Sequence, residues 1–126
     1  MNKDEIINLI NKYKLDKTKF IVISGAALTL HEIKKNANDI DIWCGKDYYN
    51  YLLDNYNCKY ERTNEYGEKA YLIDNIINFG TSFKPKEIDI IEEIQVASLK
   101  DILELKIELN RDKDKKDIEI LKNLIK

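Results

Sequence analysis

Short apolar runs and helical patterns alternate along the first half of this chain. Phe20 to Ile23 is a run of four apolar residues rich in β-branched side chains, which is typical of a strand buried on both faces. Ser24 and Gly25 end this run, and residues 26–35 then follow a helical spacing. Acidic and apolar residues alternate from Asp39 to Trp43, which predicts a second strand. We therefore expect a strand, a turn, a helix and a strand.

The rest of the pattern predicts helices at both ends of the chain and further strands between them. Apolar residues recur at helical spacing over residues 3–14. The other expected elements are a helix over 47–56, a polar loop over 59–69, strands over 70–73, 76–79, 88–91 and 94–96, and helices over 99–109 and from 112 to the chain end. Ser98 is the expected N-cap of the first C-terminal helix. This order predicts an α/β (α+β) fold in which a small mixed β-sheet is flanked by helices.

The composition is typical of a single globular domain. The chain has 126 residues, which are enough for one hydrophobic core and too few for two. Its formal net charge of −2 gives no overall attraction to nucleic acid, so a polyanionic partner would require a local basic patch. The sequence has only two cysteines, no signal-peptide pattern and no apolar run of membrane-spanning length. We therefore expect a cytoplasmic protein with no membrane partner.

Two carboxylates stand out on the second predicted strand. Because successive strand residues point to opposite faces, Asp39 and Asp41 share one face about 7 Å apart, while Ile40 and Ile42 occupy the other. Paired carboxylates at this spacing suit a divalent cation. Solvent-facing strand acids have the same spacing, so this pattern alone does not distinguish a metal site from an ordinary surface.

Each C-terminal helix carries a charged residue on its apolar face. Lys106 lies on the stripe formed by Leu99, Ile102 and Leu103, and Asp114 extends the apolar stripe of the last helix toward its N-terminus. Buried charges are costly unless they are paired or solvated, so these two residues are expected to pair with each other or to reach one cleft. The ordinary alternatives are that Lys106 extends past Leu103 to water and that Asp114 only favours a helix N-terminus.

Three passages, in a fixed order, carry the strongest signal in the sequence. They are Ser24-Gly25-Ala26-Ala27-Leu28, Asn38-Asp39-Ile40-Asp41-Ile42, and Lys106 together with Asn110-Arg111-Asp112-Lys113-Asp114-Lys115-Lys116-Asp117-Ile118. They resemble, in turn, the glycine-containing strand-to-helix turn, the metal-binding Asp-x-Asp motif and the C-terminal Lys, Arg-x-Lys-Asp-x-x-Asp-Ile pattern of the nucleotidyltransferase superfamily, which has a DNA polymerase β-like fold. Within it, the chain most resembles the small bacterial group that includes the toxins of type IV AbiE toxin–antitoxin systems.

The resemblance implies a role for each of these residues. Ser24 and Gly25 would contact nucleotide phosphates through backbone N–H groups and the serine hydroxyl at a helix N-terminus. Asp39 and Asp41 would hold Mg²⁺ or Mn²⁺, which neutralises the triphosphate and lowers the pKa of the attacking hydroxyl. The remaining expected nucleotide-binding residues are Lys106, Arg111, Lys113 and Asp114.

The chain departs from the superfamily pattern in two places: at the turn, where Ser24 precedes Gly25 and Ala26 follows it, and, more seriously, at the third carboxylate. Active members usually add a third carboxylate from a neighbouring strand, and the matching position in this chain is Asn78. An asparagine is a neutral ligand and no base, so both metal affinity and hydroxyl activation should fall. Asp89, which alternates with isoleucines on a predicted strand, is the preferred substitute as third catalytic carboxylate, with Asp74 as the other candidate. The ordinary reading of Asp89 is a solvent-facing strand acid.

Taken together, the sequence predicts a metal-dependent nucleotidyltransferase that moves a nucleoside monophosphate from an NTP to a hydroxyl of tRNA, a protein or a small molecule. The resemblance implies a toxin–antitoxin or phage-defence setting, in which an antitoxin or another protein would be a partner. The alternative is a catalytically weak or inactive domain of the same fold that binds a nucleotide or a protein partner, and Asn78 favours it. A purely structural domain is the third hypothesis.

Overall fold

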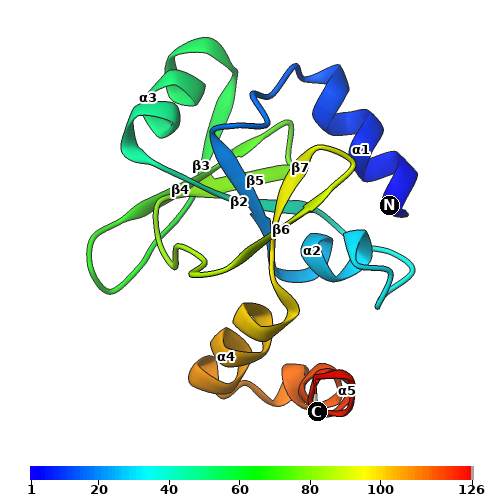
Figure 1. Ribbon diagram of the computed structural model, residues 1–126. Helices are drawn as coiled ribbons and strands as arrows, with labels where there is room; N and C mark the ends of the chain where they lie inside the picture. Colours follow the sequence, from blue (N-terminus) through cyan, green and yellow to red (C-terminus); the bar gives the residue numbers. More distant parts are fainter. Residues whose placement is uncertain (126) are drawn as a thin grey trace.

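A seven-stranded mixed sheet organises residues 1–125, which are the residues that the computed structural model describes (Figure 1). The strands are β1 (Phe20–Ile23), β2 (Ile40–Cys44), β3 (Cys58–Thr63), β4 (Lys69–Ile73), β5 (Ile77–Gly80), β6 (Ile88–Ile91) and β7 (Ile94–Ala97). The helices are α1 (Lys3–Lys12), α2 (Ser24–Leu30), α3 (Lys46–Asn55), α4 (Leu99–Leu109) and α5 (Lys115–Leu124), with a short 3₁₀ turn, η1, at Asp112–Asp114. The predicted class, a small mixed sheet with flanking helices, is confirmed.

The order of the strands puts β1 and β2 in the middle of the sheet. The order is β3-β4-β5-β2-β1-β7-β6. β2 pairs with β5, and β1 with β7, in parallel, while the remaining pairs are antiparallel. Both edges of each central strand are paired and one face is fully covered, so these strands are rich in apolar residues.

The hydrophobic core lies between one face of the sheet and helices α1, α2 and α3. Val22 pairs with both Ile42 and Val96, and Ile42 pairs in turn with Phe79, so these four side chains point to the same face. All four are buried, in one cluster with apolar residues of the three helices. The opposite face of β2 and β5 therefore carries the alternate residues, among them Asp41 and Asn78.

The C-terminal helices lie at one end of the sheet (Figure 1), and Ile102 of α4 and Leu121 of α5 are part of the buried core cluster. The predicted N-cap is confirmed, since the Ser98 side chain accepts a hydrogen bond from the Asp101 N–H group at 3.1 Å. α4 ends at Asn110, whose left-handed backbone is a common helix terminator. None of the helices within residues 1–125 combines the length and apolar character that crossing a bilayer requires.

Two predicted elements differ from the structure. Residues 59–69, predicted as a polar loop, form most of β3, a turn and the start of β4. β3 is an edge strand whose residues are almost all exposed, so it lacks the apolar alternation that identifies a half-buried strand. The helix predicted over 26–35 spans Ser24–Leu30 instead, because Glu32 adopts a left-handed backbone (φ 63°) and the chain turns there.

Candidate functional site

Asp41 stands in the middle of the sheet, on its open face. It pairs with Ile23 of β1 on one side and with Asn78 of β5 on the other. Residues paired across neighbouring strands point to the same face, so the three side chains form one row about 5 Å apart. Asn78 therefore lies where a neighbouring strand would supply a third carboxylate beside the pair, as its position in the sequence predicted.

Asp39 lies in the bend that immediately precedes β2. Its negative charge is one of the causes that raise the pKa of Asp41, so the two carboxylates lie close enough to repel each other. The structure thus brings together the two acids of the Asp-x-Asp motif at the start of a central strand. A cation between them would remove this repulsion.

Ser24 joins the site from the end of β1. Its hydroxyl lies near the Asp41 carboxylate and acts to lower its pKa, and its backbone is left-handed, with φ 58°. That conformation costs a non-glycine residue about 1 kcal/mol, and such strain often accompanies functional sites. Gly25, the next residue, has no atom within 4 Å of the place where a Cβ would stand, so the turn is open there. α2 is only seven residues long, so the hydroxyl and the backbone N–H groups matter more here than a helix dipole.

Burial and charge raise the pKa of Asp41 to about 6. Burial is the largest cause, and the charge of Asp39 acts in the same direction. The positive charge of Arg62 and the Ser24 hydroxyl lower the pKa of Asp41 but do not outweigh burial and the charge of Asp39. A nearby cation would stabilise the ionised form of Asp41, which burial disfavours.

The oxygen ligands gathered here fit a hard divalent cation such as Mg²⁺. Asp39 and Asp41 offer carboxylates, Ser24 a hydroxyl and Asn78 an amide oxygen, and Mg²⁺ prefers oxygen ligands with one or two carboxylates. Within residues 1–125 no three histidine, cysteine, aspartate or glutamate residues cluster as a metal site. The pair therefore matches a cation whose other ligands come from a substrate or water rather than a complete protein cage.

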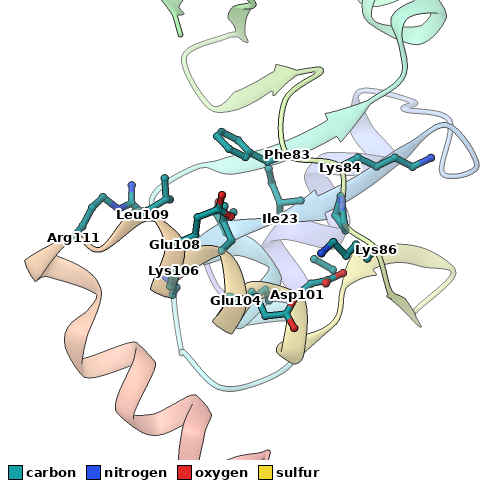
Figure 2. Close-up of a pocket in the computed structure, with 15 residues that line it drawn as sticks. Ile23, Phe83, Lys84, Lys86, Asp101, Glu104, Lys106, Glu108, Leu109 and Arg111 are labelled. Carbon is teal, nitrogen blue, oxygen red and sulfur yellow. The ribbon is translucent and has the colours of Figure 1, made fainter. Parts of the chain in front are cut away.

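A cavity of about 240 Å³ lies on the β1 side of Asp41, where Ile23 and Ser24 belong to its lining (Figure 2). Its apolar wall comes from β1, β7 and α4, including Ile23, Ala97 and Ile102, and Ser24 lies at its edge. The loop between β5 and β6 forms the opposite wall with Phe83 and the residues that follow it. The charged lining residues are Lys84, Lys86, Asp101, Glu104, Lys106, Glu108 and Arg111. Figure 2 shows Lys86 and Asp101 pointing toward one another across this space.

Lys106 and Asp114 pair with each other, which was one of the two expectations from the sequence. Lys106 is only 7% exposed and Asp114 only 4%. The Lys106 Nζ lies 2.9 Å from Asp114 Oδ1 and 3.5 Å from Asp117 Oδ2. The Arg111 Nε donates to Asp114 Oδ2 at 2.7 Å, and the Lys34 Nζ lies 2.9 Å from Asp117 Oδ2. This cluster joins α4, η1 and α5 to the segment after α2.

The pKa of Asp114 reflects this pairing. Burial raises it, but hydrogen bonds from Lys106 and Arg111 outweigh the burial, so the pKa lies below its usual value. Lys106 and Arg111 also line the cavity, so the ion cluster holds two cations at the edge of the cavity. Asp114 thus positions these cations and lies behind them, outside the set of residues that line the cavity.

Two predicted residues are not brought to the carboxylate pair. Asp89 lies on β6, the far edge strand, with β1 and β7 between it and β2. Its partner Val96 pairs with Val22, so Asp89 faces the side opposite Asp41. Its Oδ2 lies instead 3.7 Å from the Nε2 of His31. Lys113 is exposed on η1 and is not among the residues that line the cavity.

Sequence reasoning missed Arg62 and the loop residues Phe83, Lys84 and Lys86. Arg62 was assigned to a polar loop, and its charge reaches Asp41 only because β3 pairs into the sheet. The other three face the cavity only because the loop crosses to α4, and no local pattern predicts such a crossing. Pro85, the single proline, was the one signal that this loop has a defined course.

The fold and the site define a small α/β domain with an acidic pair at the start of a central strand. Residues 1–125 match the family described as "Nucleotidyltransferase of unknown function (DUF6036)", and the chain belongs to this family. This match confirms the resemblance to the nucleotidyltransferase superfamily, and it does not extend to the AbiE-type toxins. No curated protein and no solved structure shows a significant match to the chain.

Replacing Asp41 with asparagine should stabilise the protein near neutral pH in the absence of divalent cations. The folded-state pKa of about 6 exceeds the ordinary value of about 3.9, so the folded chain binds this proton more tightly than the unfolded chain. The ionised carboxyl therefore opposes folding above pH 6, and this penalty disappears as the pH falls to about 4. Thermal or urea unfolding with EDTA should show Asp41→Asn to be about 1 kcal/mol more stable at pH 7, with no gain at pH 4. Asp54→Asn, at an exposed acid of α3, is the matched control, and an equal gain there would contradict the account.

Ser24→Gly and Ser24→Ala separate backbone strain from the hydroxyl contact. Both substitutions remove the hydroxyl that lowers the pKa of Asp41, but only glycine adopts the left-handed backbone without strain. Ser24→Gly should therefore be about 1 kcal/mol more stable than Ser24→Ala in urea unfolding. The pKa of Asp41, followed by carboxyl carbon NMR, should rise in both variants. Equal stabilities would show that position 24 is unstrained.

Breaking the buried ion cluster should be costly. Lys106→Met leaves Asp114 and Asp117 without their shared cation and should lower the free energy of unfolding by about 3 kcal/mol. Adding Asp114→Asn to this variant should cost less than the sum of the two single substitutions, because the two residues are direct partners. Lys100→Met, at an exposed lysine of the same helix, is the control. Additive losses in urea unfolding would contradict the pairing.

Proposed function

We propose that this protein is a Mg²⁺-dependent nucleotidyltransferase that transfers a nucleoside monophosphate from an NTP to an acceptor hydroxyl. The observation that carries the proposal is the row formed by Ile23, Asp41 and Asn78, with Asp39 and the Ser24 hydroxyl next to it. This row brings an acidic pair, a serine turn and a cavity together on one face of the sheet. Family membership supports the reaction class.

The residues of the site have different roles in the proposed reaction. Asp39 and Asp41 bind Mg²⁺, which when bound neutralises triphosphate charge and helps the attacking hydroxyl to ionise. Ser24 and the backbone N–H groups of its turn contact the phosphates. The acceptor oxygen forms a bond to the α-phosphorus, the bond from that phosphorus to the β-phosphate oxygen breaks, pyrophosphate leaves, and the hydroxyl proton passes to solvent.

The adjoining cavity suits the nucleoside part of the NTP. It begins at Ser24, its inner wall is apolar, and Lys106 and Arg111 stand at its edge. An apolar wall accepts a flat base, and cations at the edge stabilise phosphate oxygens. Lys106 and Arg111 therefore remain in the proposed nucleotide site, held by Asp114, whereas Asp89 and Lys113 do not.

A second candidate function is nucleotide binding without efficient transfer. The observation that favours it is Asn78, which pairs directly with Asp41 and contributes no charge. A site with two carboxylates instead of three binds Mg²⁺ more weakly and has no spare base. Such a domain would bind a nucleotide or a protein partner and act through that contact.

The biological setting rests on the sequence resemblance. A cytoplasmic toxin in a bacterial toxin–antitoxin or phage-defence system would meet NTPs, RNA and an antitoxin protein there. We propose this setting as the first to examine for acceptors and partners.

The test is transfer of label from each α-labelled NTP to total bacterial RNA or lysate, with Mg²⁺ or Mn²⁺ and with EDTA. The wild-type protein should transfer label only with metal, and Asp39→Asn and Asp41→Asn should each lose the activity by at least about a hundredfold. Asp54→Asn is the control and should keep it. Asn78→Asp restores the third carboxylate and should raise transfer by about tenfold or more.

The outcomes separate the two candidate functions. Activity that survives both aspartate substitutions would refute catalysis at this site. Metal-dependent stabilisation by an NTP, without transfer by either the wild type or Asn78→Asp, would favour the nucleotide-binding alternative. An absence of both transfer and stabilisation, across all four NTPs, would refute both candidates.

A further inference from the structure

The edge strand β3 places a cation on the same open face as the acidic pair. In the β3–β4 ladder Tyr60 pairs with Tyr71, but the next pair is Arg62 with Ala70, so a β-bulge leaves Glu61 unpaired. Without the bulge, Glu61 would stand opposite Ala70 and Arg62 would point to the other face. Bulges commonly redirect a side chain in this way near functional sites.

The register then shows where the side chain of Arg62 lies. Ala70 adjoins Gly80, since a Cβ built on Gly80 would lie 3.6 Å from the Ala70 Cβ, and Gly80 pairs with Trp43 of β2. Arg62, Ala70, Gly80 and Trp43 thus form one row on the open face, beside the row that contains Asn78 and Asp41. Because its two middle members are small, the row is low in the centre and has larger side chains at its ends.

The charges at both ends of this row are positive. Arg62 is exposed, and no salt bridge of Arg62 occurs within residues 1–125. The charge of Arg62 acts to lower the pKa of Asp41 and that of Glu61 acts to raise it, so β3 lies within electrostatic range of the acidic pair. At the other end the Lys84 Nζ lies 5.1 Å from the centre of the Trp43 ring, and the indole N–H donates to the Thr81 carbonyl at 3.0 Å. Lys84 is exposed too, and Figure 2 shows it pointing away from α4.

The Arg62 end of this row lies on the side of Asp41 away from the cavity, whereas Lys84 at the other end also lines the cavity. Ser24 and the cavity adjoin Asp41 through β1, whereas Arg62 is reached through β5 and β4. In a displacement at phosphorus the attacking and leaving oxygens lie roughly in line, on opposite sides of the reacting phosphate. A donor bound on the β1 side therefore receives its acceptor from the β5 side.

We propose that Arg62 and Trp43, with Lys84 at the border of the donor cavity, form the acceptor subsite, and that the acceptor is a phosphate-bearing nucleotide, either free or at the end of a single-stranded RNA. This inference rests on the proposed nucleotidyl transfer. Guanidinium and ammonium groups recognise phosphate, and an indole offers a flat surface on which a base stacks. Repulsion between acceptor phosphates and the acidic pair is offset by the same two cations. Arg62 is a positioning residue, and it takes no part in the bond changes.

The test measures binding of three probes to the full chain: a short fluorescent single-stranded RNA, AMP, and a non-hydrolysable NTP with Mg²⁺. Arg62→Gln should weaken RNA binding by about tenfold and lower its salt slope by about one, because one phosphate contact is lost. Lys69→Gln is the matched control, since it removes the same charge from an exposed residue of the same hairpin that points to the other face. It should leave RNA binding within about twofold of wild type.

The measurement of NTP binding tests the proposed function separately from the acceptor subsite. NTP binding should be unchanged in Arg62→Gln and lost in Asp41→Asn. AMP binding that weakens together with RNA binding would identify a free nucleotide as sufficient, and weakening of RNA binding alone would identify a polynucleotide end. Both results support the subsite.

Three results would overturn it. If Arg62→Gln weakens binding of the NTP instead of binding of RNA and AMP, Arg62 belongs to the donor site. If the wild-type protein binds the NTP but neither RNA nor AMP, the proposed class of acceptor is refuted and the proposed function stays intact. Transfer of label to protein alone would have the same two consequences. A wild-type protein that does not bind the NTP would remove the proposed function, and this inference with it.

Discussion

Asp41 is held between Ile23 and Asn78 by the ladders of two central strands, and this register determines the rest of the site. It buries the carboxylate enough to raise its pKa to about 6 and brings Asp39 and the Ser24 hydroxyl against it. A one-residue slip of β2 would turn both acids into the core and the isoleucines outward, which the core does not permit. The hydrophobic effect on one face of the sheet therefore fixes the electrostatics on the other.

The two sides of this carboxylate differ in chemistry. On the β1 side lie a strained serine turn and a cavity with an apolar wall, with Lys106 held at its edge by Asp114. On the β5 side lie a neutral asparagine and an open sheet face that leads to Arg62. The ion cluster of the C-terminal helices thus serves the site indirectly, because it fixes cations that would otherwise be mobile on the surface. Its buried ion pairs also join α4 to η1 and α5 in one specific arrangement.

The sequence predicted the parts of this site that depend on local patterns. The span Phe20–Ile23 is the strand that its apolar run predicts, and Asn78 lies beside Asp41 as its order along the chain implied. The polar edge strand β3 was missed because its residues are exposed on both faces and carry no periodic signal. The bulge that places Arg62 on the same face as the acids and the loop that closes the cavity arise from long-range pairing, which no local pattern encodes. Asp89 failed as a substitute acid because strand alternation fixes a face only once the sheet order is known.

The most direct measurement of the central claim is the position of a bound metal–nucleotide. Mn²⁺ added with a non-hydrolysable NTP broadens the NMR signals of nearby amides, so it marks the place of the cation in solution. The account predicts that broadening centres on the amides of Ser24, Asp39, Asp41 and Asn78 and disappears in Asp41→Asn. Broadening centred instead on the acidic residues of η1 and α5, and unchanged by that substitution, would contradict it.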